Sequence, residues 1–204
     1  MSKVVESWIW KGALTTAAVT AGLIYGASQA QALDLTVGGA FDDPDDVFLI
    51  EFSVAGPGPF VPFTAFTSNF DLTSLLTDPI DPILTLFSGT GDFAFRETVD
   101  DDGAQGYSAD VDGVIFTGDF FDSLLDVSLP VGDYTLGLSS FPNFAEGPLL
   151  GDGYSNFGFD FGTGDFRVHL LGVDQILGTQ GPAPVSPSFP RGDFISRATG
   201  RVSS

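Results

Sequence analysis

The sequence contains no cysteine and only a single histidine among its 204 residues. Without cysteine the chain forms no disulfide and carries no thiol nucleophile. One histidine excludes a zinc site built on two histidines, and a serine-type catalytic triad would have to use it. That residue, His169, lies in an alternating apolar stretch, and the chain has no G-x-S-x-G motif. We therefore predict an ordinary strand histidine on an outer face, and a protein that is not an enzyme.

Basic residues are also scarce, with seven Lys and Arg against 27 Asp and Glu. Two of the acids, Glu6 and Asp193, lie outside residues 33–185, which leaves 25 acids there. The only basic residues in that part are Arg96 and Arg167, so its net charge is −23. Such a surface repels nucleic acid phosphates and anionic lipids, and it attracts divalent cations or basic partners. The alternative is that the charge only keeps the protein soluble.

The first 32 residues have the three parts of an export signal. Lys3 and Lys11 supply positive charge, an apolar stretch covers 13–27, and a small-x-small cleavage site ends at Ala32. The apolar stretch is shorter than the about 20 residues that span a membrane. We predict a cleaved signal peptide over 1–32, a secreted protein, and no membrane span in the mature chain. The alternative is an uncleaved amphipathic helix.

Short apolar stretches that alternate, or that glycine, proline and aspartate bound, predict β-strands. They lie at 47–54, 60–66, 83–87, 93–95, 125–129, 134–138 and 166–170, with a further candidate at 157–161. Pro62 would place its strand at an edge or a bulge. The strands at 125–129 and 134–138 would pair as a hairpin. No helical stripe supplies the crossovers that a parallel sheet needs.

These strands predict an all-β fold, a two-sheet antiparallel β-sandwich of the jelly-roll kind that follows an N-terminal signal helix. We place this domain at 33–174. A Pro-rich and basic composition predicts a disordered tail over 175–204. The mature chain of about 170 residues suits one domain and can bury a core without disulfides.

Several short phrases occur in the order of a known family: Asp81–Phe87, Asp100–Gly103, Asp122–Leu125 and Leu129–Leu136. Their order and spacing resemble the bacterial pre-peptidase C-terminal domain. The whole arrangement most resembles a family of uncharacterised exported proteins from bacteria with the PEP-CTERM/exosortase sorting system. The resemblance implies a β-sandwich, export and no established catalytic activity. It also implies a C-terminal sorting tag, but no apolar span follows Gly181, so we expect release to the exterior.

Runs of aspartate form the best candidate site. Three consecutive aspartates precede a glycine, and two more flank the next loop of the same connection. Calcium takes six to eight oxygen ligands, and a bound cation would relieve the repulsion between adjacent carboxylates. We predict a Ca²⁺ site formed by Asp100, Asp101, Asp102, Asp110 and Asp112. The alternative is that these aspartates only form turns, and the same choice applies to the acidic run at 42–46.

Aromatic residues in the loops suggest a different site. Tyr107, Tyr154 and several phenylalanines of these loops could stack on sugar rings. The alternative is that the phenylalanines fill the core: Phe141, Phe144, Phe157, Phe159 and Phe161. Our first function hypothesis, which rests on the family resemblance and export, is a secreted non-catalytic module for cell-surface or extracellular-matrix assembly, stabilised by calcium. The alternative is a carbohydrate-binding module, and the third hypothesis is a hydrolase with paired carboxylates. The expected partner is an extracellular polysaccharide or a surface protein, not a nucleic acid.

Overall fold

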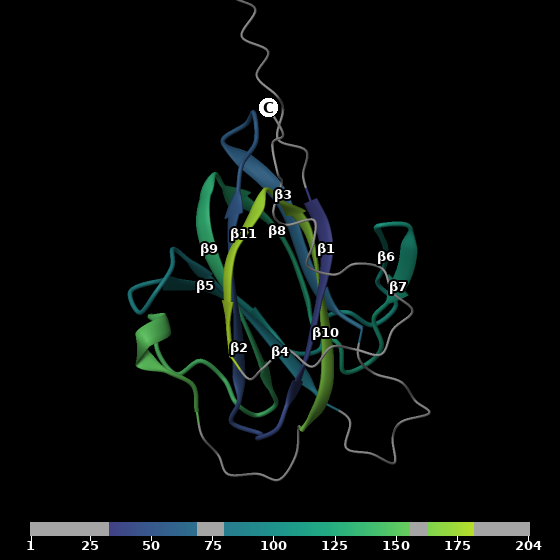
Figure 1. The fold of residues 1–204 in the computed structure, drawn as a ribbon, viewed down its shortest axis with the longest axis vertical. Helices are drawn as coiled ribbons and strands as arrows, with labels where there is room; N and C mark the ends of the chain where they lie inside the picture. Colours follow the sequence, from purple (N-terminus) through teal and green to yellow (C-terminus); the bar gives the residue numbers. More distant parts are fainter. Residues whose placement is uncertain (1–32, 69–79, 156–162, 182–204) are drawn as a thin grey trace, which may run out of the picture.

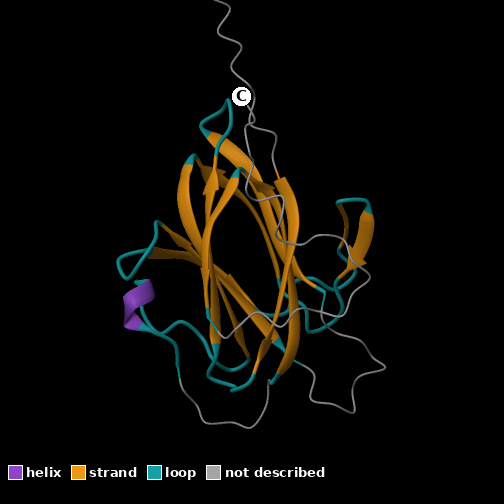
Figure 2. Cartoon of the chain, viewed as in Figure 1, coloured by secondary structure: helices purple, strands orange, loops and turns teal. Residues whose placement is uncertain are grey.

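A computed structural model of the protein describes residues 33–68, 80–155 and 163–181, which hold eleven β-strands and one 3₁₀ helix, η1, at Leu150–Asp152 (Figures 1 and 2). The first five strands are β1 Leu33–Phe41, β2 Val47–Val54, β3 Phe60–Thr67, β4 Pro82–Ser88 and β5 Phe95–Asp100. The others are β6 Ser108–Val111, β7 Val114–Thr117, β8 Leu124–Pro130, β9 Gly132–Ser140, β10 Gly164–Val173 and β11 Gln175–Gln180.

The strands form two antiparallel sheets and a separate hairpin, which confirms the predicted all-β sandwich. Sheet A has the order β1-β10-β3-β8, sheet B has the order β11-β2-β9-β4-β5, and β6 pairs with β7. Without β6, β7 and β11, the remaining eight strands pair as β1–β10, β2–β9, β3–β8 and β4–β5. This is the order of a jelly roll, in which one long antiparallel ribbon folds into two facing sheets.

The core lies between the sheets, and strict alternation in β2 shows how the sequence fills it. Phe48, Ile50, Phe52 and Val54 are buried, whereas the residues between them are only partly covered. From the opposite sheet, Phe63 stacks on Phe52 with ring centroids 4.9 Å apart. Each such side chain contributes about 1.5–3 kcal/mol through burial, so a Cys-free chain still has a stable core.

The predicted hairpin of β8 with β9 is wrong. β8 pairs with β3 in sheet A, whereas β9 pairs with β2 and β4 in sheet B. The turn at Val131 therefore carries the chain from one sheet to the other, and the apolar sides of both strands belong to the same core cluster. Alternation identifies the buried face of a strand, but it does not identify the neighbouring strand.

The prediction that Pro62 marks an edge strand is only partly right, because β3 lies between β10 and β8. β10 pairs with β3 only over Thr64–Thr67, so Pro62 has a ladder partner on one side alone, Ser128 of β8. A missing N–H is tolerated at such a place. Gly172, at φ 84°, sits where a Cβ would collide with the Pro62 carbonyl, so the chain needs glycine here.

Four strands were not predicted, β1, β6, β7 and β11, and the strand predicted at 93–95 shares only Phe95 with β5. β11 joins the edge of sheet B, so the sandwich continues to Gln180, six residues past the predicted boundary at Asp174. The predicted signal helix, the candidate strand at 157–161 and the tail from 182 lie outside the described residues. Among the residues that are described, no helix has the length and apolar character to cross a membrane.

Candidate functional site

His169 lies on the outer face of sheet A, as predicted, but that face is covered here. The hairpin β6–β7, which we did not predict, supplies Phe116, whose ring centroid is 4.1 Å from that of His169. The ring of Phe66 packs on His169 at 4.5 Å. The imidazole is therefore fully buried rather than exposed. Strand alternation could not reveal this, because the cover comes from another part of the chain.

Two hydroxyl groups bind the ring nitrogens of His169. Nδ1 is 2.7 Å from the hydroxyl oxygen of Thr36, and Nε2 is 2.7 Å from that of Ser68. Burial, with a smaller effect of the Arg167 charge, lowers the pKa of His169 to about 3. A ring that stays neutral at physiological pH donates one hydrogen bond and accepts the other. Such a histidine is a poor base, and a threonine stands where a triad would place its acid. We assign it a structural role.

Asp100, the first residue of the predicted Ca²⁺ site, fastens its own loop. Its Oδ2 accepts hydrogen bonds from the N–H groups of Gly103 and Leu124, both at 2.8 Å. The carboxylate thereby ties the connection after β5 to the start of β8. Asp101 is half-buried and Asp102 is exposed on the same turn.

The other two predicted ligands lie in the hairpin β6–β7. Asp110 Oδ1 accepts a hydrogen bond from the N–H of Gly113 at 2.8 Å. Asp112 has a φ of 51°, and Asp-Gly is a favoured pair for a two-residue turn with positive φ. Across the three described ranges, no three acidic or histidine side chains gather as a metal site requires. The Ca²⁺ site stays a prediction.

The acidic run before β2 also bonds to itself. Asp46 Oδ2 accepts hydrogen bonds from the N–H groups of Asp42 and Asp43, both at 2.9 Å. Asp43 Oδ1 accepts one from the N–H of Asp45 at 3.0 Å. These contacts are those of aspartates that shape turns.

Asp81 lies within the electrostatic reach of three other carboxylates that the sequence did not place beside it, although the four do not gather as metal ligands would. Asp81 precedes β4, and its Oδ1 is buried with no hydrogen-bond partner in the described part of the chain. Burial, together with the negative charges of Asp102, Asp101 and Asp122, raises the pKa of Asp81 to about 7. Asp122 itself is fully buried and accepts a hydrogen bond from the Thr67 hydroxyl at 2.7 Å. Only Asp101 and Asp102 belong to the predicted calcium ligands.

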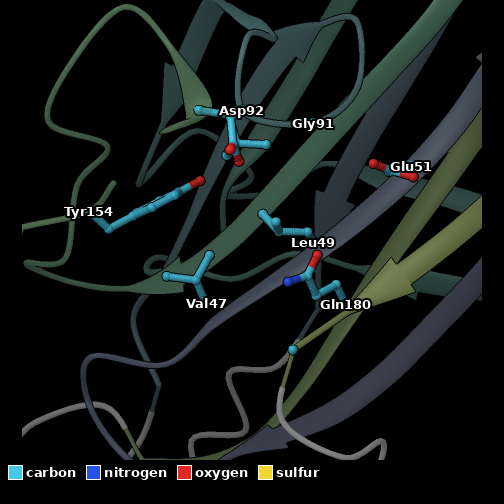
Figure 3. A pocket seen from close by; sticks show the side chains of 9 residues that line it. Val47, Leu49, Glu51, Gly91, Asp92, Tyr154 and Gln180 are labelled. Carbon is cyan, nitrogen blue, oxygen red and sulfur yellow. The ribbon is translucent and has the colours of Figure 1, made fainter. Parts of the chain in front are cut away.

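A pocket of about 300 Å³ lies on the outer face of sheet B (Figure 3). This volume is at the lower end of the range for small-molecule sites, about 300–1,000 Å³. Side chains on the outer side of β2 form its floor, and β11, the turn between β4 and β5, and the segment around η1 surround it. The lining residues are Val47, Leu49, Glu51, Gly91, Asp92, Leu150, Tyr154, Gln180 and Gly181.

Backbone hydrogen bonds hold the walls of the pocket together. The N–H of Leu150 donates to the Ala94 carbonyl at 2.9 Å, and the N–H of Gly151 donates to the Asp92 carbonyl at 2.8 Å. The guanidinium of Arg96 donates to the carbonyl of Ala145 at 2.7 Å, which fixes the segment that follows β9. The turn that carries Asp92 is therefore held against η1.

Tyr154 forms one wall, and Figure 3 shows its phenol reaching toward the turn that carries Asp92. The hydroxyl lies over Gly137 of β9, where any Cβ would collide with it, so this glycine makes room for the ring. Burial raises the pKa of Tyr154, and the nearby hydroxyl of Thr85 and the charge of Arg96 lower it less. Both hydroxyl oxygens, of Tyr154 and Thr85, are buried without a hydrogen-bond partner among the described residues.

The predicted loop aromatics thus have different roles. Tyr154 lines the pocket, whereas Tyr107 packs edge-on against Phe66 at 5.0 Å, beneath the hairpin β6–β7. Phe141 and Phe144 pack against each other at 5.8 Å, and Phe141 stays 44% exposed instead of filling the core. The candidates Phe157, Phe159 and Phe161 lie outside the described residues.

The polar residues of the pocket were not predicted as a site. Glu51, Asp92 and Gln180 come from three distant segments, and none belongs to a recognisable motif. The chain matches no known protein-family model and no curated protein. The resemblance to the exported family therefore stays a prediction, and the pocket is the feature of the structure that bears most directly on function.

Proposed function

We propose that the protein is an exported, non-catalytic carbohydrate-binding module and that the pocket on sheet B is its ligand site. One observation carries the proposal: the pocket combines an aromatic wall, Tyr154, with three polar groups, Glu51, Asp92 and Gln180, above an apolar floor. Sugar rings have apolar C–H faces that pack on aromatic and aliphatic side chains, and hydroxyl groups that bond to carboxylates and amides.

An exposed aromatic residue on the turn that carries Asp92 supports the same proposal. Phe93 follows Asp92 on the turn between β4 and β5, and 87% of its surface is exposed. A phenylalanine this exposed costs free energy in water, and a stacked ligand would recover part of it. The open, solvent-facing position of the site suits a polymer, whose chain can continue past the pocket at both ends.

Binding of a polysaccharide would let the protein take part in cell-surface or matrix assembly, our first hypothesis from the sequence. The hydrolase hypothesis stays a prediction: the pocket holds two carboxylates, Glu51 and Asp92, and turnover of a bound glycan would test whether they act as a catalytic pair.

The test is a glycan-binding screen with the purified protein, followed by titration calorimetry on the ligands found. We expect Phe93→Ala and Asp92→Asn to weaken binding about tenfold each, since stacking and one charged hydrogen bond each contribute about 1–2 kcal/mol. Phe120→Ala is the matched control, because Phe120 is 54% exposed on the loop that follows β7, away from the pocket. Absence of binding to any glycan, or equal loss in the control, would refute the proposal, and turnover of a bound glycan would favour a hydrolase.

A further inference from the structure

The pocket contains negative charge but no positive charge. Its two ionisable carboxyl groups are those of Glu51 and Asp92, and the other polar side chain is the neutral amide of Gln180. Carboxylates only accept hydrogen bonds, so a ligand group that bonds to either of them must be a donor. A sugar hydroxyl can donate one hydrogen bond, whereas an ammonium group donates up to three and also carries the opposite charge.

Neither arginine of the sandwich lines the pocket. The guanidinium of Arg96 lies behind the pocket wall, where it donates a hydrogen bond to the Ala145 carbonyl and its charge acts on Tyr154. The guanidinium of Arg167 lies 5.5 Å from the ring centroid of Phe116, which belongs to the hairpin β6–β7. Figure 1 shows the hairpin β6–β7, which holds Phe116, on the opposite side of the sandwich from the turn beside β5. Residues 33–185 carry 25 acids in all, the two of the pocket included. Its field attracts cations to the pocket and repels acidic polymers.

We propose that the ligand is a cationic polysaccharide, a polymer of amino sugars whose amino groups are free, with Glu51 and Asp92 as the ammonium-binding groups. This inference rests on the proposed function and specifies the class of carbohydrate. Acidic polysaccharides, such as those built from uronic acids, are excluded by the charge of the pocket. A fully N-acetylated polymer keeps its stacking contacts with Tyr154 and Phe93, but it loses the ion pairs.

The experiment compares two oligosaccharides of equal length, one of β-1,4-linked glucosamine and the other its fully N-acetylated counterpart, by calorimetry on the purified protein. Two partly exposed ion pairs predict an about tenfold tighter binding of the free amine at low salt. Raising the salt to about 0.5 M should remove most of this preference, because exposed charges are then screened. An oligomer of galacturonic acid should not bind.

The double variant Glu51→Gln, Asp92→Asn should bind the two oligosaccharides equally. The matched control is Asp110→Asn, Asp112→Asn, which removes two charges from the hairpin β6–β7. Both control side chains keep an oxygen for their turn, and asparagine tolerates the positive φ of 112. This control should keep the tenfold preference, which separates the effect of the pocket from that of overall charge.

Each of the other possible results would refute one part of the proposal. Equal binding of the acetylated and free sugars by the unaltered protein would refute the cationic ligand and leave the carbohydrate-binding proposal standing. A preference that survives in the double variant would place the ammonium groups elsewhere. Binding of no sugar at all would refute both proposals. Tighter binding of an arginine-rich peptide, lost in the same double variant, would assign the pocket to a basic protein partner instead.

Discussion

Acidification should destabilise the protein through His169, and the size of the effect follows from its burial. The ring is held neutral between Phe66 and Phe116, with a pKa of about 3 in the folded state against 6.5 for an exposed histidine. The folded pKa is depressed, so between these two values the unfolded chain binds a proton that the folded chain does not. The free energy of unfolding therefore falls as the pH drops below 6.5.

The magnitude can be worked out from the linkage relation. Each pH unit below 6.5 costs about 1.4 kcal/mol, so the loss between about pH 7.5 and about pH 5 is about 2 kcal/mol. For a domain of this size that is a fall of roughly 4–8 °C in melting temperature. In the variant His169→Gln the side chain does not titrate, and its amide can still bond to the hydroxyl of Ser68. The variant should be less stable at neutral pH, because packing between the two phenylalanine rings is lost.

The assay is urea unfolding of both proteins at the two pH values, followed by circular dichroism. Fluorescence of tryptophan is unsuitable, because both tryptophans, Trp8 and Trp10, lie in the predicted signal. Other carboxyl groups also titrate over this range, but they do so in both proteins, so the difference between the two isolates His169. We expect the difference in unfolding free energy between the unaltered protein and His169→Gln to be about 2 kcal/mol smaller at the lower pH. Parallel pH profiles would show that the histidine is protonated in the fold, and would refute the reasoning.

Three further predictions concern Asp81, the wall of the pocket and calcium. Asp81 has a raised pKa of about 7, so its protonated form stabilises the fold at low pH, and this contribution is lost as the pH rises through 7. The substitution Asp81→Asn removes the ionised carboxylate, so it should raise the free energy of unfolding at about pH 8 by about 1–2 kcal/mol, a value reduced for the partial exposure of the group. Urea unfolding measures this change. Equal free energies of unfolding for the variant and the unaltered protein above pH 7 would contradict this prediction. Gly137→Ala should displace the hydroxyl of Tyr154, lower the free energy of unfolding by about 1–3 kcal/mol and weaken glycan binding. Glycan binding at full strength in this variant would show that the Tyr154 wall is not needed. The calcium hypothesis expects a melting temperature that Ca²⁺, but not Mg²⁺, raises by several degrees, and Asp101→Asn with Asp102→Asn should remove the rise. An equal melting temperature in chelator would assign these aspartates to turns.

The sequence predicted strands where apolar residues alternate, as in 47–54, because alternation reports directly on which side chains meet the core. It did not predict β1, β6, β7 or β11. It did not predict the sheet to which a strand belongs. β8 and β9 look like a hairpin, since only a short turn separates them, yet this turn crosses the core. The outer-face position of His169 was predicted, but its burial was not, because the ring that covers it comes from Phe116, 53 positions away in the chain.

The candidate site was harder to predict than the fold. A run of aspartates such as Asp100–Asp102 suggests a metal site in a sequence. Each carboxylate of such a run can instead accept a hydrogen bond within its own turn, as Asp100 does from the N–H of Gly103. The pocket residues are single acids and amides in three segments, and only the strand order brings them together. The one sequence signal that bore on the pocket was an aromatic residue, Tyr154, in a Gly-rich loop.

The pairing of β1 with β10 has a consequence for how the chain acquires its structure. Leu33 is the partner of Val173, so this ladder joins positions 140 residues apart, and β10 in turn separates β1 from β3. Sheet A therefore cannot close while a ribosome or a translocation channel still holds the later part of the chain. Contacts this distant in sequence make folding slow, because a large loop must close before any of its stabilising contacts form. A chain that stays open until its last strands emerge is well suited to being threaded through a membrane before it folds.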